Sequence, residues 1–186
     1  MTTEQVYAIG MALVNAVIVL ACLRIREPRS VGAVQLLRWA FAAMAVSWAL
    51  FLVPSQPLFF AVGFFASAAY LWLMAAFAFR RSGRPIPWVW ILLVYAAHAS
   101  ITAFFAVQGN VPAGLHATTV FASLALLPVA YLFLAVKPNR TVSDIAFAAA
   151  HLALVIVAAV RTVLLLVAPQ WLEGSIMVSQ VLWPGV

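Results

Sequence analysis

Six stretches of about 20 mostly apolar residues recur along this chain, and each is long enough to cross a lipid bilayer as a helix. Each stretch is bounded by arginines, prolines, glycines or other turn-forming residues. We therefore expect an all-α fold, a polytopic integral membrane bundle in which neighbouring helices are antiparallel. The expected spans are residues 6–23, 36–53, 58–79, 88–107, 116–136 and 145–168.

The composition agrees with this fold and excludes several classes of soluble protein. Of the 186 residues, 67% are hydrophobic and 8% are charged, whereas a soluble domain is about half apolar and about a quarter charged. Too few polar residues remain to cover a water-exposed surface, which excludes a soluble enzyme, a nucleic-acid-binding module and a disordered chain. The single cysteine, Cys22, excludes an internal disulfide and a cysteine-rich metal site.

The basic residues alternate along the chain and so predict its orientation. Nine of the ten lysines and arginines lie in or beside the first, third and fifth connections, and the tenth, Arg161, lies inside a span. Short basic loops stay on the cytoplasmic side, so we expect the N-terminus to lie outside. The leader contains no lysine or arginine, so the first apolar stretch is interpreted as a retained helix and not as a cleaved signal.

A further apolar segment, residues 175–186, follows the sixth span. It would cover about 18 Å of a hydrocarbon core that is about 30 Å thick, so we interpret it as the start of a seventh crossing that continues in a longer protein. A short tail lying on the outer surface is the alternative. No connection is long enough to form a second domain, so residues 1–186 are expected to form a single membrane-embedded domain.

Two patterns inside the spans predict helix packing. Gly63 and Ser67 form a pair of small residues four positions apart, which is typical of a close helix–helix contact in membranes. Pro128 lies inside the fifth span and is expected to kink it, because proline cannot donate the backbone hydrogen bond of a regular helix.

Polar side chains are costly in hydrocarbon, so those inside the spans are the functional candidates. Arg161 lies in the outer third of the sixth span, where it either reaches the external headgroups or faces the bundle and binds an anionic ligand. His98 lies near the middle of the fourth span, and Tyr95 and Thr102 share its face. These residues, together with Trp48 on the second span, are the expected ligand contacts.

Cofactor chemistry has only one candidate pair in the spans. His98 and His151 lie on different helices and could in principle ligate a haem, but a lone histidine inside a membrane span more often forms an interhelical hydrogen bond. We expect no cofactor and no metal site. The only lysine, Lys137, is in a connection, and the spans contain no aspartate or glutamate. Catalysis and ion-coupled transport are therefore not expected within these residues.

Three segments carry a resemblance to a known family. Residues Leu36–Trp48, Tyr70–Pro85 and His151–Val163, the last with its arginine at Arg161, resemble the multi-helix N-terminal sensor regions of bacterial GGDEF-type diguanylate cyclases. The resemblance covers nearly the whole chain through helix order, loop lengths and a few positions. It implies a bacterial inner-membrane protein whose six to seven helices precede a cytoplasmic cyclase that makes cyclic di-GMP as a homodimer. The chain itself contains no GG[DE]EF motif.

These observations favour a membrane sensory or input domain that binds a small ligand or senses the state of the bilayer. We expect it to signal to a C-terminal cytoplasmic output domain absent from this chain. One alternative is a haem- or quinone-binding subunit of a membrane redox complex. Others are a small transporter and a structural partner within a larger membrane assembly.

Overall fold

The computed structural model describes residues 3–24, 31–52 and 57–167, and in these ranges the chain forms six α-helices and one π-helical turn. All six helices are long and apolar enough to cross a membrane, which confirms the expected spans and is typical of a multi-pass membrane protein. The predicted seventh crossing (175–186) and the side chain of Arg161 lie outside the described residues. The elements are α1 (Thr3–Arg24), α2 (Val31–Leu50), α3 (Pro57–Arg81), α4 (Trp88–Val107), α5 (Val111–Tyr131), η1 (Leu132–Val136) and α6 (Val142–Val167).

The observed helices differ from the expected spans mainly where they begin. α5 begins at Val111 and not at residue 116, because the side chain of Asn110 accepts a hydrogen bond from the Ala113 amide (3.2 Å) and caps the helix. α6 begins at Val142 and not at residue 145, because Thr141 caps it in the same manner. Polar caps extend both helices beyond the apolar run that marks each span.

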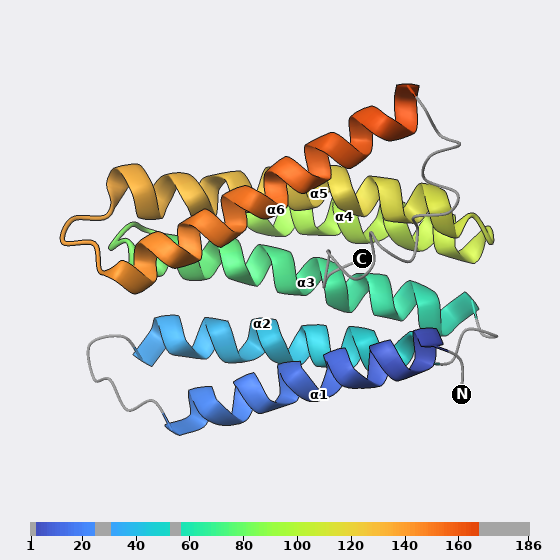
Figure 1. Ribbon diagram of the computed structural model, residues 1–186, viewed down its shortest axis with the longest axis horizontal. Coiled ribbons are helices and arrows are strands. Elements are labelled where there is room, and N and C mark those ends of the chain that lie inside the picture. The colour runs from blue at the N-terminus through green and yellow to red at the C-terminus, as the bar shows by residue number, and fades with distance from the viewer. Residues whose placement is uncertain (1–2, 25–30, 53–56, 168–186) are drawn as a thin grey trace.

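α3 is the central helix of the bundle. It packs against α2 on one side and against α4 and α5 on the other, whereas α1 packs on α2 and α6 packs on α5 and η1 (Figure 1). Small residues on α3 allow these close approaches, since a side chain without bulk lets two helix backbones come together. Its fully buried alanines are Ala68, Ala75, Ala76 and Ala78.

The interior of the bundle is mainly apolar but also contains several polar side chains, and the outer surface is largely apolar as well. His98, Thr102, Thr118 and Ser47 are at most 1% exposed, while large apolar side chains cover the outer faces of the helices. The exposed set includes Leu13, Val17 and Leu20 on α1, Val89, Trp90 and Leu93 on α4, and Ile156, Val160 and Val163 on α6. Apolar surface of this extent is typical of contact with lipid.

Apart from Arg161 on α6, the basic residues of the described chain lie at one end of the bundle. The end of α1, the α3–α4 connection and the η1–α6 connection lie together there, while the α4–α5 connection lies at the opposite end (Figure 1). This confirms that the alternation in the sequence places the positive charges on one side. The described residues at this end are Arg24, Arg38, Arg80, Arg81, Arg84, Lys137 and Arg140.

The close contact predicted at Gly63 is observed, whereas the kink predicted at Pro128 stays a prediction. A Cβ atom at Gly63 would lie 2.5 Å from Cε1 of Phe51, and the Ser47 hydroxyl donates to the Gly63 carbonyl (2.9 Å), which confirms the close contact of α3 with α2. Pro128 lies inside α5 shortly before the helix changes to the π-helical turn η1. In η1 the Lys137 amide donates to the Leu132 carbonyl five residues earlier (2.8 Å), as in a π-helix.

Candidate functional site

A buried hydrogen bond joins α3 to α4 near the middle of the bundle. The indole Nε1–H of Trp72 donates to Nδ1 of His98 at 3.3 Å, and His98 is only 1% exposed. Acceptance at Nδ1 places the proton of the imidazole on Nε2. His98 therefore serves as an acceptor between two helices, as predicted for a histidine inside a span.

A third helix closes over the same imidazole. The ring of Phe121 on α5 stacks on His98 with the centroids 4.7 Å apart and the planes 13° from parallel. Trp72, His98 and Phe121 thus connect α3, α4 and α5 through one polar contact and one stacked pair. The sequence indicated His98 but neither of its partners, because no helical spacing links residues on different spans.

Of the residues predicted to share the face of His98, Thr102 forms its hydrogen bonds within its own helix. The Thr102 hydroxyl donates to the carbonyl oxygens of His98 (2.9 Å) and Ala99 (3.2 Å), and the side chain is fully buried. Such bonds satisfy a hydroxyl in a low-dielectric interior without a ligand. In this structure Thr102 therefore has a packing role beside His98.

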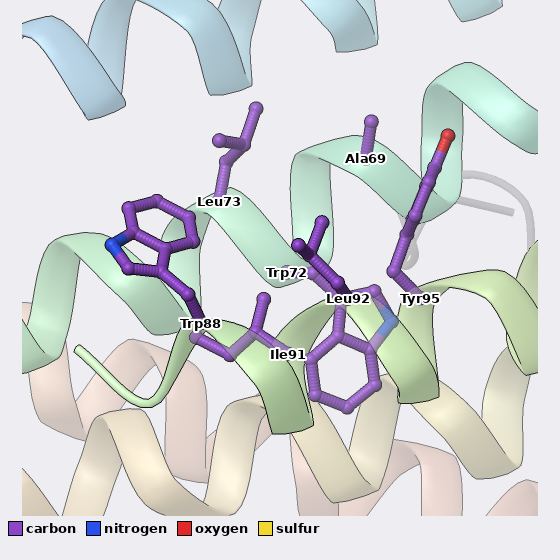
Figure 2. Close-up of a pocket in the computed structure, with 7 residues that line it drawn as sticks. All are labelled: Ala69, Trp72, Leu73, Trp88, Ile91, Leu92 and Tyr95. Atoms are coloured by element: carbon purple, nitrogen blue, oxygen red, sulfur yellow. The ribbon is translucent and has the colours of Figure 1, made fainter.

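Tyr95 lies at one end of an apolar cleft on the outer side of the α3–α4 contact. The cleft has a volume of about 240 Å³ and is partly open, and Trp72 forms part of its wall (Figure 2). Trp72 therefore contacts both the cleft and His98, so the cleft and the buried polar pair share one side chain. The lining residues are Ala69, Trp72, Leu73, Trp88, Ile91, Leu92 and Tyr95.

Trp48 belongs to a different part of the bundle. It lies in a core cluster with Ala8 and Met44 and makes an edge contact with Tyr7 of α1 at 5.4 Å between ring centroids. The structure thus places Trp48 between α1 and α2 and does not bring it together with His98. Arg161 lies on α6, and its side chain is not among those that the structure describes.

The two histidines considered for haem ligation have separate aromatic surroundings. Nδ1 of His151 is hydrogen-bonded to the Phe147 carbonyl (2.7 Å), and the two rings lie 4.1 Å apart. His98 is bonded to Trp72 and stacked on Phe121. Each imidazole is therefore enclosed by its own protein partners, an arrangement that favours packing roles for both.

The basic end contains an ion-pair network that the sequence analysis missed. Asp144, at the start of α6, pairs with Lys137 and lies 3.7 Å from Nε of Arg81 at the end of α3. Its carboxylate also accepts from the amide (2.9 Å) and hydroxyl (2.7 Å) of Thr141, as in a capping box. The capping box has a sequence signal: a threonine is followed three positions later by an acidic residue, just before an apolar run.

Arg38 likewise has a specific contact besides its charge. Its guanidinium donates through Nε (3.0 Å) and a terminal nitrogen (2.7 Å) to the carbonyl oxygen of Cys22, near the C-terminal end of α1. Terminal carbonyls of a helix lack partners within the helix and carry partial negative charge, so a cation stabilises them. Arg38 therefore links α2 to the end of α1.

Comparisons of the chain with protein-family models, with curated proteins and with solved structures find no match.

Proposed function

We propose that this chain is the membrane-embedded input domain of a signalling protein, with a ligand site at the cleft between α3 and α4. The observation that carries the proposal is the double role of Trp72, which forms part of the cleft wall and donates to buried His98. A ligand that moves the indole therefore changes a hydrogen bond in the centre of the bundle. The family resemblance supports a cytoplasmic diguanylate cyclase, active as a homodimer, as the output domain.

Transmission follows contacts between neighbouring helices. His98 stacks on Phe121 of α5, and α5 packs along α6, which leads to the C-terminal part of the chain. Such a route transmits a signal only if the ligand binds two arrangements of the bundle with different affinities. If the binding free energies for the two arrangements differ by 1.4 kcal/mol, a saturating ligand alters the ratio of the two arrangements about tenfold.

The orientation is part of the proposal. Because the basic end carries nearly all the lysines and arginines, we place it in the cytoplasm and the N-terminus outside. In a Cys22→Ser background, a membrane-impermeant maleimide applied to intact spheroplasts should label Gln108→Cys, in the α4–α5 connection, and spare Arg140→Cys, at the basic end. The opposite labelling pattern would contradict this orientation.

Signalling is tested in the full-length protein after its reading frame has been followed beyond Val186. The proposal requires a completed crossing and a cytoplasmic signalling domain there, and a frame without them overturns it. Trp72→Phe keeps an aromatic ring but removes the donor to His98, so we expect a severalfold change in cellular cyclic di-GMP. Trp90→Phe is the matched control, since Trp90 is 70% exposed on the outer face of α4. Equal output from both variants and the wild type would refute the role of Trp72.

A further inference from the structure

The α3–α4 cleft has the size and lining of a site for a single apolar chain. Its volume of about 240 Å³ exceeds the about 150 Å³ cavity that takes up benzene, and it is smaller than the about 300–1,000 Å³ of pockets for drug-sized ligands. The cleft extends from Trp88 to Tyr95, which is about 10 Å along α4. These dimensions fit one branch of an amphiphile whose remaining parts stay outside.

The open side of the cleft faces the surroundings of the bundle. Trp88 is 44% and Leu92 57% exposed, whereas Trp72 at the inner wall is 8% exposed. In Figure 2, Trp88 and Leu73 lie toward one end of the cleft, and Ala69 and Tyr95 lie toward the other. Because the exposed apolar faces of the described helices are those of a membrane protein, the occupant enters from the bilayer.

The end of the cleft at Trp88 adjoins the basic α3–α4 connection. α3 ends in a Schellman motif: Gly83 adopts φ +72°, its amide donates to the Arg80 carbonyl (3.2 Å), and the Arg84 amide donates to the Phe79 carbonyl (3.0 Å). This turn fixes the backbone of Arg84 four residues before Trp88.

The arginines of this connection differ in what they contact. Arg81 is engaged by Asp144, but Arg80 and Arg84 are exposed and form no ion pair within the described part of the chain. The segment Arg80–Pro87 contains no acidic residue. The Arg80 guanidinium lies beside Gly32 of α2, so Arg84 is the arginine available near the Trp88 end of the cleft for a negatively charged group.

We propose that the cleft binds one acyl chain of an anionic phospholipid, with the headgroup phosphate beside Arg84. The Tyr95 hydroxyl lies toward the far end of the site. This assignment deepens the proposed function, on which it rests, by naming the ligand class of the same cleft. The cytoplasmic leaflet, where the proposed orientation places this end, is the one rich in anionic lipids.

Photolabelling in lipid nanodiscs tests the proposal. The probe is phosphatidylglycerol with a diazirine on one acyl chain, diluted into phosphatidylcholine, and phosphatidylcholine with the same labelled chain is the comparison. Labelled peptides are mapped by mass spectrometry. An arginine near the membrane surface contributes about fivefold to binding of an anionic lipid, so we expect at least about fivefold more labelling at Ala69–Tyr95 by phosphatidylglycerol.

Two pairs of variants distinguish the contribution of the lipid's acyl chain from that of its headgroup. Ala69→Leu fills the cleft and should remove most labelling by either lipid, whereas Ala153→Leu, exposed on α6, should leave it unchanged. Arg84→Gln should lower the preference for phosphatidylglycerol about fivefold, whereas Arg140→Gln, exposed at the same end of the bundle, should preserve it. Both arginine variants change surface residues, so they remain informative if a cleft variant fails to fold.

Equal labelling by the two lipids, or unchanged labelling of folded Ala69→Leu, would overturn the lipid assignment. Labelling is measured without any signalling readout, so it is independent of the cyclic di-GMP assay with Trp72→Phe. If the cleft prefers phosphatidylglycerol but Trp72→Phe leaves cellular cyclic di-GMP unchanged, the input function alone is refuted. An output that responds to Trp72→Phe, with no lipid preference at the cleft, would refute the lipid assignment alone.

Discussion

The contact of α2 with α3 at Gly63 predicts that one added methyl group destabilises the bundle. In the Gly63→Ala variant the new Cβ atom would lie 2.5 Å from Cε1 and 2.9 Å from Cδ1 of Phe51. The Phe51 ring has little freedom to retreat, because it contacts the rings of Trp48, Phe60 and Phe64 at centroid distances of 5.5–6.0 Å. Therefore either the aromatic rings must rearrange or α2 and α3 must move apart.

The size of the effect is the sum of one stabilising and two destabilising contributions. Replacing glycine by alanine inside a helix stabilises it by about 1 kcal/mol. Overpacking a filled contact costs about 1–3 kcal/mol. Separation of the helices also weakens the bond from the Ser47 hydroxyl to the Gly63 carbonyl, and such bonds contribute on average about 0.6 kcal/mol in membrane proteins. We expect Gly63→Ala to lower the free energy of unfolding by about 0.5–2.5 kcal/mol.

Gly10→Ala is the matched control, because a Cβ atom at Gly10 on α1 would meet nothing within 4 Å. The same substitution there should raise the free energy of unfolding by about 0.5–1 kcal/mol. Both values are measured by titrating the purified protein in mixed micelles with sodium dodecyl sulfate and following helical circular dichroism. If the two variants shift the midpoint in the same direction, the close contact at Gly63 does not control stability.

Three further substitutions test individual polar contacts. Trp72→Phe should lower the free energy of unfolding by about 0.6–1.7 kcal/mol, and the loss should shrink in a His98→Leu background; equal losses in both backgrounds would show that the hydrogen bond contributes nothing. Arg38→Met should speed maleimide alkylation of buried Cys22 about tenfold or more, because charge-assisted bonds contribute about 1.5–3 kcal/mol each, and an unchanged rate would contradict the capping role. Asp144→Asn should lower the free energy of unfolding by about 3 kcal/mol in the same titration, because it leaves the largely buried Lys137 without its counter-charge, and a loss below about 0.5 kcal/mol would contradict it.

The sequence predicted the helices well because each span carries its own signal. Twenty consecutive apolar residues satisfy their backbone groups only as a helix in lipid, so α4 was predicted to begin at Trp88 and end at Val107, as observed. The helix starts were less accurate, since Asn110 and Thr141 extend α5 and α6 through polar caps. Hydropathy alone assigns such polar residues to the connections.

The site was predicted only in part, because its contacts join different helices. His98 was identified from the cost of a polar group in hydrocarbon, but Trp72 and Phe121 look like ordinary apolar residues in a one-dimensional pattern. Trp48 shows the same limit of a one-dimensional pattern. It was grouped with His98 as an expected ligand contact, whereas in the structure it contacts Tyr7 of α1.

If the chain is an input domain as proposed, α3 offers a second route from the cleft to α6, besides the route through Phe121 and α5. The ligand contacts expected from the sequence lay on the second, fourth and sixth spans, at Trp48, at His98 with Tyr95 and Thr102, and at Arg161. In the structure α6 packs on α5 and η1, and its start is tied to α3 through Asp144 and Arg81. α3 also carries Trp72, so one rigid helix joins the wall of the cleft to the beginning of α6. A small rotation of α3 would then alter the His98 bond and the Asp144 network together, so both contacts would report the same movement.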